Sequence, residues 1–169
     1  VVSSMVFPLP PPGYSGLEHL AWQQAEGLAK LGHDVTVLCP QGSRCDHARV
    51  LEVSPPGQWD EEQSYARYWG ELLNYDVIID HSWSKWSYIL KSEGKLKAPV
   101  LGVMHAPVNT MYQSYPPVEK ACIVCISKDQ ANHFEALFNK PARVAYNGVD
   151  PEFYKPMPGV QRTNRFLFL

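Results

Sequence analysis

The sequence contains no dense cluster of lysine and arginine, no long hydrophobic run and no internal repeat. Its 169 residues carry a formal net charge of −2, so we expect no nucleic-acid-binding surface. No apolar stretch approaches the roughly 20 residues that a transmembrane helix requires. The N-terminus also has no basic region of the kind that precedes a secretory signal. We therefore expect a cytoplasmic protein that spans no membrane.

Cysteine is scarce, with four residues in the chain. Cys122 and Cys125 have the spacing of a redox or zinc motif, but they lie in an apolar segment that is typical of a buried strand. Residues three apart on a strand face opposite sides of the sheet, so these two thiols could not pair there. We interpret them as small buried side chains in a reducing compartment, with a dithiol or zinc role as the alternative.

What the sequence does contain is a regular alternation of strand-like and helix-like segments, and 45% of its residues are hydrophobic. We expect strands at 1–6, 34–39, 49–53, 76–80, 99–104, 121–126 and 142–146, and helices at 17–31, 60–73, 84–93 and from 128 onward. Gly32 and Gly94 follow two of the helices, and a Ser-x-x-Gln capping box at 127–130 opens the last. This alternation predicts an α/β fold with a doubly wound, parallel, Rossmann-like sheet.

The helix expected at 60–73 is rich in aromatic residues. We expect its inward face to consist of Tyr65, Tyr68, Trp69, Leu72 and Leu73. These aromatic side chains are better interpreted as core than as a platform for a ligand.

The segment 10–18, Pro-Pro-Pro-Gly-Tyr-Ser-Gly-Leu-Glu, joins the first expected strand to the first helix. A glycine-containing turn at this point leaves backbone N–H groups free at the positive end of the helix dipole. Glycine also lets a ligand approach the backbone closely. The turn therefore suits a phosphate or another anion, although many α/β proteins place glycine there for packing alone.

Six blocks occur in an order that resembles the N-terminal half of a family-4 glycosyltransferase of the GT-B fold. They are residues 10–18, 28–37, 75–83, 103–107, 125–130 and 146–156. The resemblance implies two Rossmann-like domains that face each other across a cleft. It places the N-terminal domain at 1–150. Residues 151–169 would be the crossing to a C-terminal donor-binding domain and the first strand of that domain.

The resemblance also implies a reaction, the transfer of a sugar from a nucleotide-sugar donor to a hydroxyl of a glycan, lipid or small molecule. Transfer would occur with retention at the anomeric carbon, and neither a metal nor another cofactor is expected. Gly16 would offer its N–H to the distal phosphate of the donor. Many relatives have two glycines at this turn, whereas this chain has Ser15 and Gly16, and the serine side chain narrows the turn where a phosphate would approach.

His105 matches the family histidine that contacts the donor sugar, and we expect it to be the catalytic residue. A structural role is the alternative for this histidine. Candidate acceptor-binding residues lie at the start of the first helix and after the strand at 76–80: Glu18, His19, Asp80, His81 and Trp83. The competing interpretation of 80–83 is a capped strand–helix junction with a packed tryptophan. Residues 109–115 form a polar and aromatic loop that would line the acceptor site.

The family's main donor-binding residues belong to the second domain, which this sequence does not include. We therefore expect the chain alone to be inactive and to need a C-terminal GT-B domain, in the same or a separate polypeptide. The alternative is a non-catalytic module that binds a nucleotide or a glycan. A third candidate is another GT-B enzyme, such as a sugar-nucleotide epimerase, which the block at 10–18 and the Asn-Gly-Val-Asp segment at 147–150 disfavour.

Overall fold

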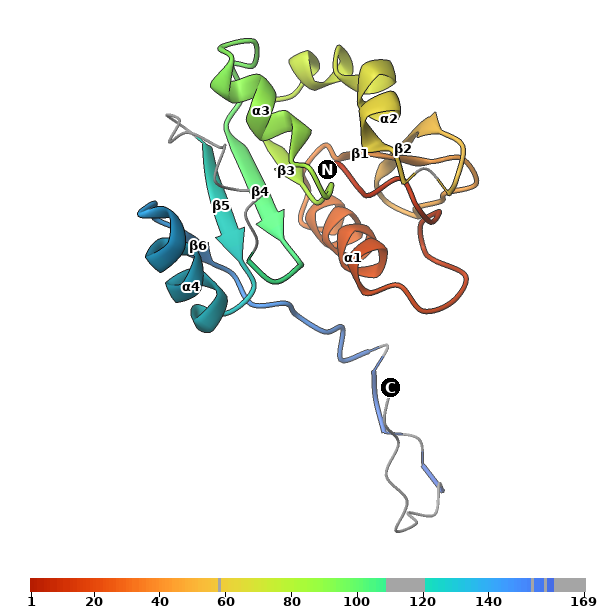
Figure 1. Ribbon diagram of the computed structural model, residues 1–169. Helices are drawn as coiled ribbons and strands as arrows, with labels where there is room; N and C mark the ends of the chain where they lie inside the picture. Colours follow the sequence, from red (N-terminus) through yellow and green to blue (C-terminus); the bar gives the residue numbers. More distant parts are fainter. Residues whose placement is uncertain (58, 109–120, 153, 157, 160–169) are drawn as a thin grey trace.

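The computed structural model describes residues 1–57, 59–108, 121–152, 154–156 and 158–159 (Figure 1). The strands are β1 Thr36–Pro40, β2 Arg49–Ser54, β3 Ile78–Asp80, β4 Val100–Met104, β5 Ala121–Cys125 and β6 Arg143–Val144. All of their pairings are parallel, in the orders β2-β1 and β3-β4-β5-β6. Six of the seven expected strands are thus present as strands.

The seventh expected strand, at residues 1–6, is reduced to a single bridging residue. Val2 makes parallel bridges with Leu38 of β1 and Asp80 of β3, and it joins the two groups of strands. The prediction of a full strand was wrong because Ser4 interrupts it. The Ser4 hydroxyl donates to Glu18 and accepts from the N–H of Val6 at 3.5 Å, so side-chain bonds replace ladder bonds.

With Val2 as the central strand, the strand order corresponds to that of a doubly wound nucleotide-binding sheet. The expected α/β, Rossmann-like fold is confirmed. The order of strands reverses at Val2, because the chain moves outward first through β1 and β2 and then, on the other side, through β3 to β6.

The helices are α1 Gly16–Lys30, α2 Glu61–Tyr68, α3 Trp86–Ser92 and α4 Lys128–Phe138, with a 3-10 helix η1 at Glu71–Asn74. Helix α1 ends as the sequence indicates, because Gly32 has φ +93° and its N–H donates to Ala29 O while His33 N–H donates to Leu28 O. Helix α4 begins with the expected cap, in which the Ser127 hydroxyl accepts from Gln130 N–H.

The helix expected at 60–73 is in fact two shorter elements. Helix α2 ends at Tyr68 and η1 starts at Glu71, so the 3.6-residue period is broken near Gly70. Tyr68 and Leu72 are buried as expected, but 43% of Trp69 and 53% of Leu73 are exposed. The prediction that these last two side chains face inward was wrong because the period changes between them.

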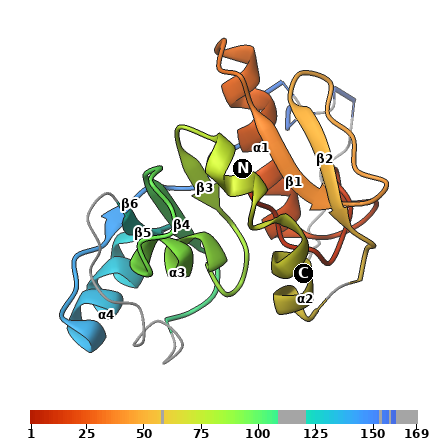
Figure 2. The same cartoon turned by 90° about the horizontal axis from the view of Figure 1, so that it is seen from above.

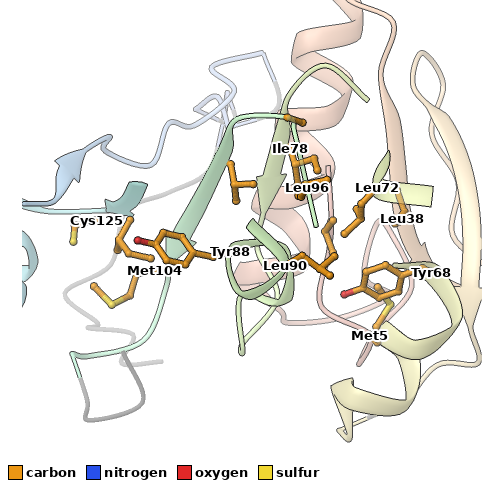
Figure 3. Packing of buried hydrophobic residues seen from close by; sticks show 14 of the residues in the cluster. Met5, Leu38, Tyr68, Leu72, Ile78, Tyr88, Leu90, Leu96, Met104 and Cys125 are labelled. Atoms are coloured by element: carbon orange, nitrogen blue, oxygen red, sulfur yellow. The ribbon is translucent and has the colours of Figure 1, made fainter. Parts of the chain in front are cut away.

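Helix α1 lies on one side of the sheet, and α2, α3 and α4 lie on the other (Figure 2). The larger core cluster joins residues of both strand groups to the helices on the second side (Figure 3). Its members include Met5, Leu38, Tyr68, Leu72, Ile78, Tyr88, Leu90, Leu96, Met104 and Cys125. A smaller cluster packs α1 on β1 through Ala25, Val37 and Cys39.

The four cysteines carry free thiols. Cys122 is half-buried and Cys125 is fully buried in β5. Burial raises the pKa of the Cys125 thiol to about 11, so the thiol stays protonated at neutral pH. This protonation fits the interpretation of Cys125 as a buried core side chain.

Candidate functional site

The candidate site lies at the carboxyl edge of the sheet, where His81 follows β3 and His105 follows β4. In open parallel sheets, ligands bind at this edge beside the point where the strand order reverses. That point lies between Val2 and β3 in this protein. The edge is therefore where a ligand-binding site is expected from topology alone.

A cavity of about 610 Å³ adjoins this edge, between α1, one face of the sheet and residues 145–151. The segment that follows β6 runs past the ends of β5 and β4 toward α1 (Figure 1). Tyr154 reaches α1, where its hydroxyl lies 3.3 Å from Nε2 of His19. Apolar side chains of β3, β4 and β5 line the cavity together with His81 and polar side chains of α1.

His81 and His105 lie side by side in this site. Nδ1 of His81 is 2.8 Å from Nε2 of His105, and the two rings stack with centroids 5.0 Å apart. The other nitrogen of His81, Nε2, is 2.6 Å from Oε1 of Gln24 on α1. A continuous hydrogen-bonded chain thus runs from α1 through His81 to His105.

Both histidines are neutral at physiological pH. Burial lowers the pKa of His81 well below its usual value, and the neighbouring His105 and Lys85 lower it further. Burial and the Lys85 cation lower the pKa of His105 to about 4. At neutral pH, His105 can therefore donate one hydrogen bond and accept another, and its ring carries no positive charge.

Asp80 organises the loop that carries His81. It is fully buried, and its carboxylate accepts from Ser82 N–H at 2.8 Å, from Ser87 N–H at 3.0 Å and from the Ser87 hydroxyl. These bonds support the interpretation of a capped strand–helix junction. A direct contact between Asp80 and an acceptor stays a prediction.

Glu61 holds the same loop from the direction of α2. Its carboxylate oxygens accept from Trp83 N–H at 2.8 Å and from Ser84 N–H at 2.9 Å. Burial raises the pKa of Glu61, while these two backbone bonds lower it. The side chain of Trp83 is 41% exposed, so it is available to a ligand rather than packed in the core.

Lys85 is a buried cation within the same loop. It is 2% exposed, it has left-handed backbone angles, and its Nζ donates to the carbonyl of Ser82. Gly102 of β4 leaves room for its stem, because a Cβ there would lie 3.3 Å from Cδ of Lys85. Burial lowers the pKa of Lys85, and the carboxylates of Asp80 and Glu61 raise it.

The glycine turn before α1 is open to solvent. A Cβ added at Gly16 would meet no atom within 4 Å, so packing does not explain why a glycine occupies this position. Ser15 is the N-cap residue, but its hydroxyl donates to Glu18 instead of accepting from the helix. The first N–H groups of α1 consequently have no side-chain cap.

Of the residues predicted for acceptor binding at the start of α1, Glu18 is 4% exposed, and its two carboxylate oxygens accept from the hydroxyls of Ser4 and Ser15. His19 packs against Trp22 and Tyr154. Their contact with an acceptor stays a prediction. The loop at 109–115 lies outside the described residues.

The sequence predicted that His81 and His105 lie at one edge of the sheet, but it did not indicate three further residues of the site. Gln24 occupies an ordinary polar position of a helix, Lys85 stands in no recognisable motif, and Glu61 is one of two acidic residues in the first turn of α2. Only the tertiary fold brings Gln24 to His81 and Glu61 to the loop after β3, in which Lys85 itself lies. Within the described ranges, no group of three or more His, Cys, Asp or Glu side chains could hold a metal ion.

The chain was compared with known protein families and with curated proteins. The model for Glycosyltransferase Family 4 matches residues 14–153, whereas none of the curated proteins compared with the chain matches it. No helix in the described part of the chain is long and apolar enough to cross a membrane. The match includes Gly16 in the turn before α1, both histidines and residues 145–153 after β6. The chain therefore belongs to glycosyltransferase family 4, as an N-terminal domain of the GT-B type.

Proposed function

We propose that this chain is the acceptor-side half of a retaining glycosyltransferase that uses a nucleotide-sugar. The observation that carries this proposal is a neutral, half-buried His105 at the carboxyl edge of the sheet, on the same scaffold as the open N-terminus of α1. A neutral imidazole suits a sugar hydroxyl, and a free helix N-terminus suits a diphosphate. No cofactor is needed, because the nucleotide-sugar is itself a substrate.

The diphosphate leaving group develops negative charge during transfer, and positioned N–H donors stabilise that charge. The N–H of Gly16, with support from Ser15, is the candidate donor in this half. Exposed Trp83 and half-buried His19 are candidates for contact with the acceptor, and the remaining donor-binding groups would come from a C-terminal domain. Residues 166–169, expected to be the first strand of that domain, lie outside the described residues.

The first test is the intact mass of the purified protein under native and denaturing conditions. A copurifying chain of similar size that carries the C-terminal half would indicate a two-chain enzyme. If no such chain is present, the C-terminal half is supplied by coexpression. In either case the complex is incubated with UDP-, GDP- and ADP-sugars, and nucleotide release is measured with and without glycan acceptors.

Substitution of His105 by Ala should lower kcat/KM at least 10-fold, because the enzyme loses a hydrogen bond to the donor sugar. His33→Ala is the matched control, because His33 is an exposed histidine that follows the opposite end of α1. NMR of the product would determine whether the anomeric configuration is retained. Donor binding without turnover in the complete complex would instead favour the non-catalytic module.

A further inference from the structure

The hydrogen-bonded chain of Gln24, His81 and His105 fixes where the protons lie. Oε1 of Gln24 can only accept, so the Nε2 of His81 that lies 2.6 Å away carries a proton. A neutral imidazole has one N–H, and Nδ1 of His81 must therefore accept. The nitrogen 2.8 Å from it, Nε2 of His105, is then the donor.

The same logic determines the state of the second nitrogen of His105. With its single proton on Nε2, neutral His105 has a lone pair on Nδ1. No hydrogen bond to this Nδ1 occurs within the described part of the chain. The nitrogen is thus free to accept a hydrogen bond from a ligand.

We propose that Gln24 and His81 are positioning residues that hold His105 as the Nε2–H tautomer, so that Nδ1 accepts a hydrogen bond from a ligand hydroxyl. A lone pair attracts an O–H group and repels the oxygen atoms of a phosphate, so this nitrogen selects the sugar part of a donor rather than its diphosphate. The assignment of the ligand rests on the proposed function, whereas the tautomer does not.

The surroundings keep His81 in the state that this proposal requires. His81 is 3% exposed, and Lys85, a buried cation, lies close enough to oppose a charge on either ring. The nearest carboxylate in sequence, that of Asp80, is occupied by Ser82 and Ser87. Gln24 is neutral, so it orients His81 without attracting a second proton.

The direct test is long-range ¹H–¹⁵N NMR of the histidine side chains in the 169-residue chain at pH 7, with no ligand. Side-chain signals are assigned with His81→Phe and His105→Gln. We expect both His81 and His105 as neutral Nε2–H tautomers. An Nδ1–H tautomer or a charged ring at His105 would overturn the proposal.

Gln24→Glu should reverse the arrangement. The new carboxylate still accepts from Nε2 of His81, but its charge favours a proton on Nδ1 as well. That proton would be donated to Nε2 of His105, and His105 would become the Nδ1–H tautomer. Gln23→Glu is the matched control for the spectrum, because it adds the same charge one residue away without the contact to His81.

In the complex with the C-terminal half, Gln24→Glu should lower kcat/KM for the nucleotide-sugar at least 10-fold and leave KM for the acceptor unchanged. Gln24→Leu, which removes the acceptor atom and adds no charge, should give mixed tautomers and a smaller loss. A switched tautomer with unchanged kcat/KM would overturn the positioning role. Absence of turnover in the wild-type complex, with the tautomer as stated, would instead refute the proposed function alone.

Discussion

At the scale of single residues, the site depends on charges that the fold keeps out of water. Lys85 lies among the carboxylates of Asp80 and Glu61 and the rings of two histidines, and it is 2% exposed. A buried charge is tolerated when opposite charges and hydrogen bonds compensate it. Lys85 therefore balances the two carboxylates, and it adds to the burial that keeps both histidines neutral.

Lys85→Met should destabilise the protein by about 3 kcal/mol, because two buried carboxylates lose their compensating cation. Urea unfolding monitored by circular dichroism would measure the loss. The control is Lys95→Met on the surface, which breaks only an exposed pair with Glu93 and should change stability by less than about 1 kcal/mol. Equal effects of the two substitutions would contradict the role of Lys85.

Protonation of His105 should make the protein less stable at acidic pH. Its folded pKa of about 4 lies below its ordinary value of 6.5, so the unfolded state binds more protons between these values. The contribution of His105 is complete above pH 6.5 and is lost as the pH falls toward 4. Lowering the pH from 7.5 to 5 should therefore reduce the free energy of unfolding by about 2 kcal/mol through His105 alone.

Urea unfolding at both pH values would measure this contribution as the difference between the wild type and His105→Gln. His81 shifts in the same direction, so some acid sensitivity should remain in the variant. An identical pH dependence in the two proteins would show that His105 is not held neutral by the fold.

At the scale of elements, Gln130 ties the start of α4 to the turn after His105. Its Oε1 accepts from Ile126 N–H and its Nε2 donates to the carbonyl of Ala106, both at 2.8 Å. Besides its position in the capping box of α4, Gln130 therefore links the carboxyl ends of β4 and β5 at the edge where the site lies.

Gln130→Met should cost about 1 kcal/mol, because two half-buried backbone groups lose their partners. It should also increase hydrogen exchange of the amides of His105, Ala106 and Val108. Ser127→Ala is the control, since it removes the cap of the same helix, at a similar cost, without touching Ala106. Exchange at 105–108 that rises equally in both variants would argue against the link.

At the scale of the whole molecule, Val2 connects the two groups of strands. Its N–H donates to Ile79 O at 2.8 Å and its carbonyl accepts from His81 N–H at 2.8 Å, while Ser3 N–H donates to Leu38 O. The larger core cluster also contains residues from both groups. We therefore expect the two halves of the sheet to unfold together.

Val2→Ala should lower the free energy of unfolding by about 2 kcal/mol, since the side chain is 1% exposed. Native-state hydrogen exchange should show the same loss in β1 and in β4. A loss confined to one strand would mean that the two groups of strands unfold independently. Val77→Ala, at a 53% exposed position before β3, is the matched control and should have little effect.

The fold could largely be predicted from the sequence, because period and turn chemistry are local. Gly32, Gly94 and the Ser127 cap end or begin helices through bonds within a few residues, and each lies where expected. The failures were non-local or marginal. The hydroxyl of Ser4 bonds Glu18, fourteen residues away, and the strand at 1–6 is interrupted there. The helix expected at 60–73 is divided into α2 and the 3-10 helix η1.

By itself, the sequence determined the doubly wound sheet, the family and the placement of His81 and His105 at one edge, since each follows a buried parallel strand. Only the tertiary structure decided the protonation state and the tautomer of those two histidines. Gln24 comes from a helix 57 residues away in sequence from His81, and Glu61 of α2 binds the loop that carries both His81 and Lys85. A proton's position depends on which atoms lie within hydrogen-bond distance, and no local pattern in the chain specifies that.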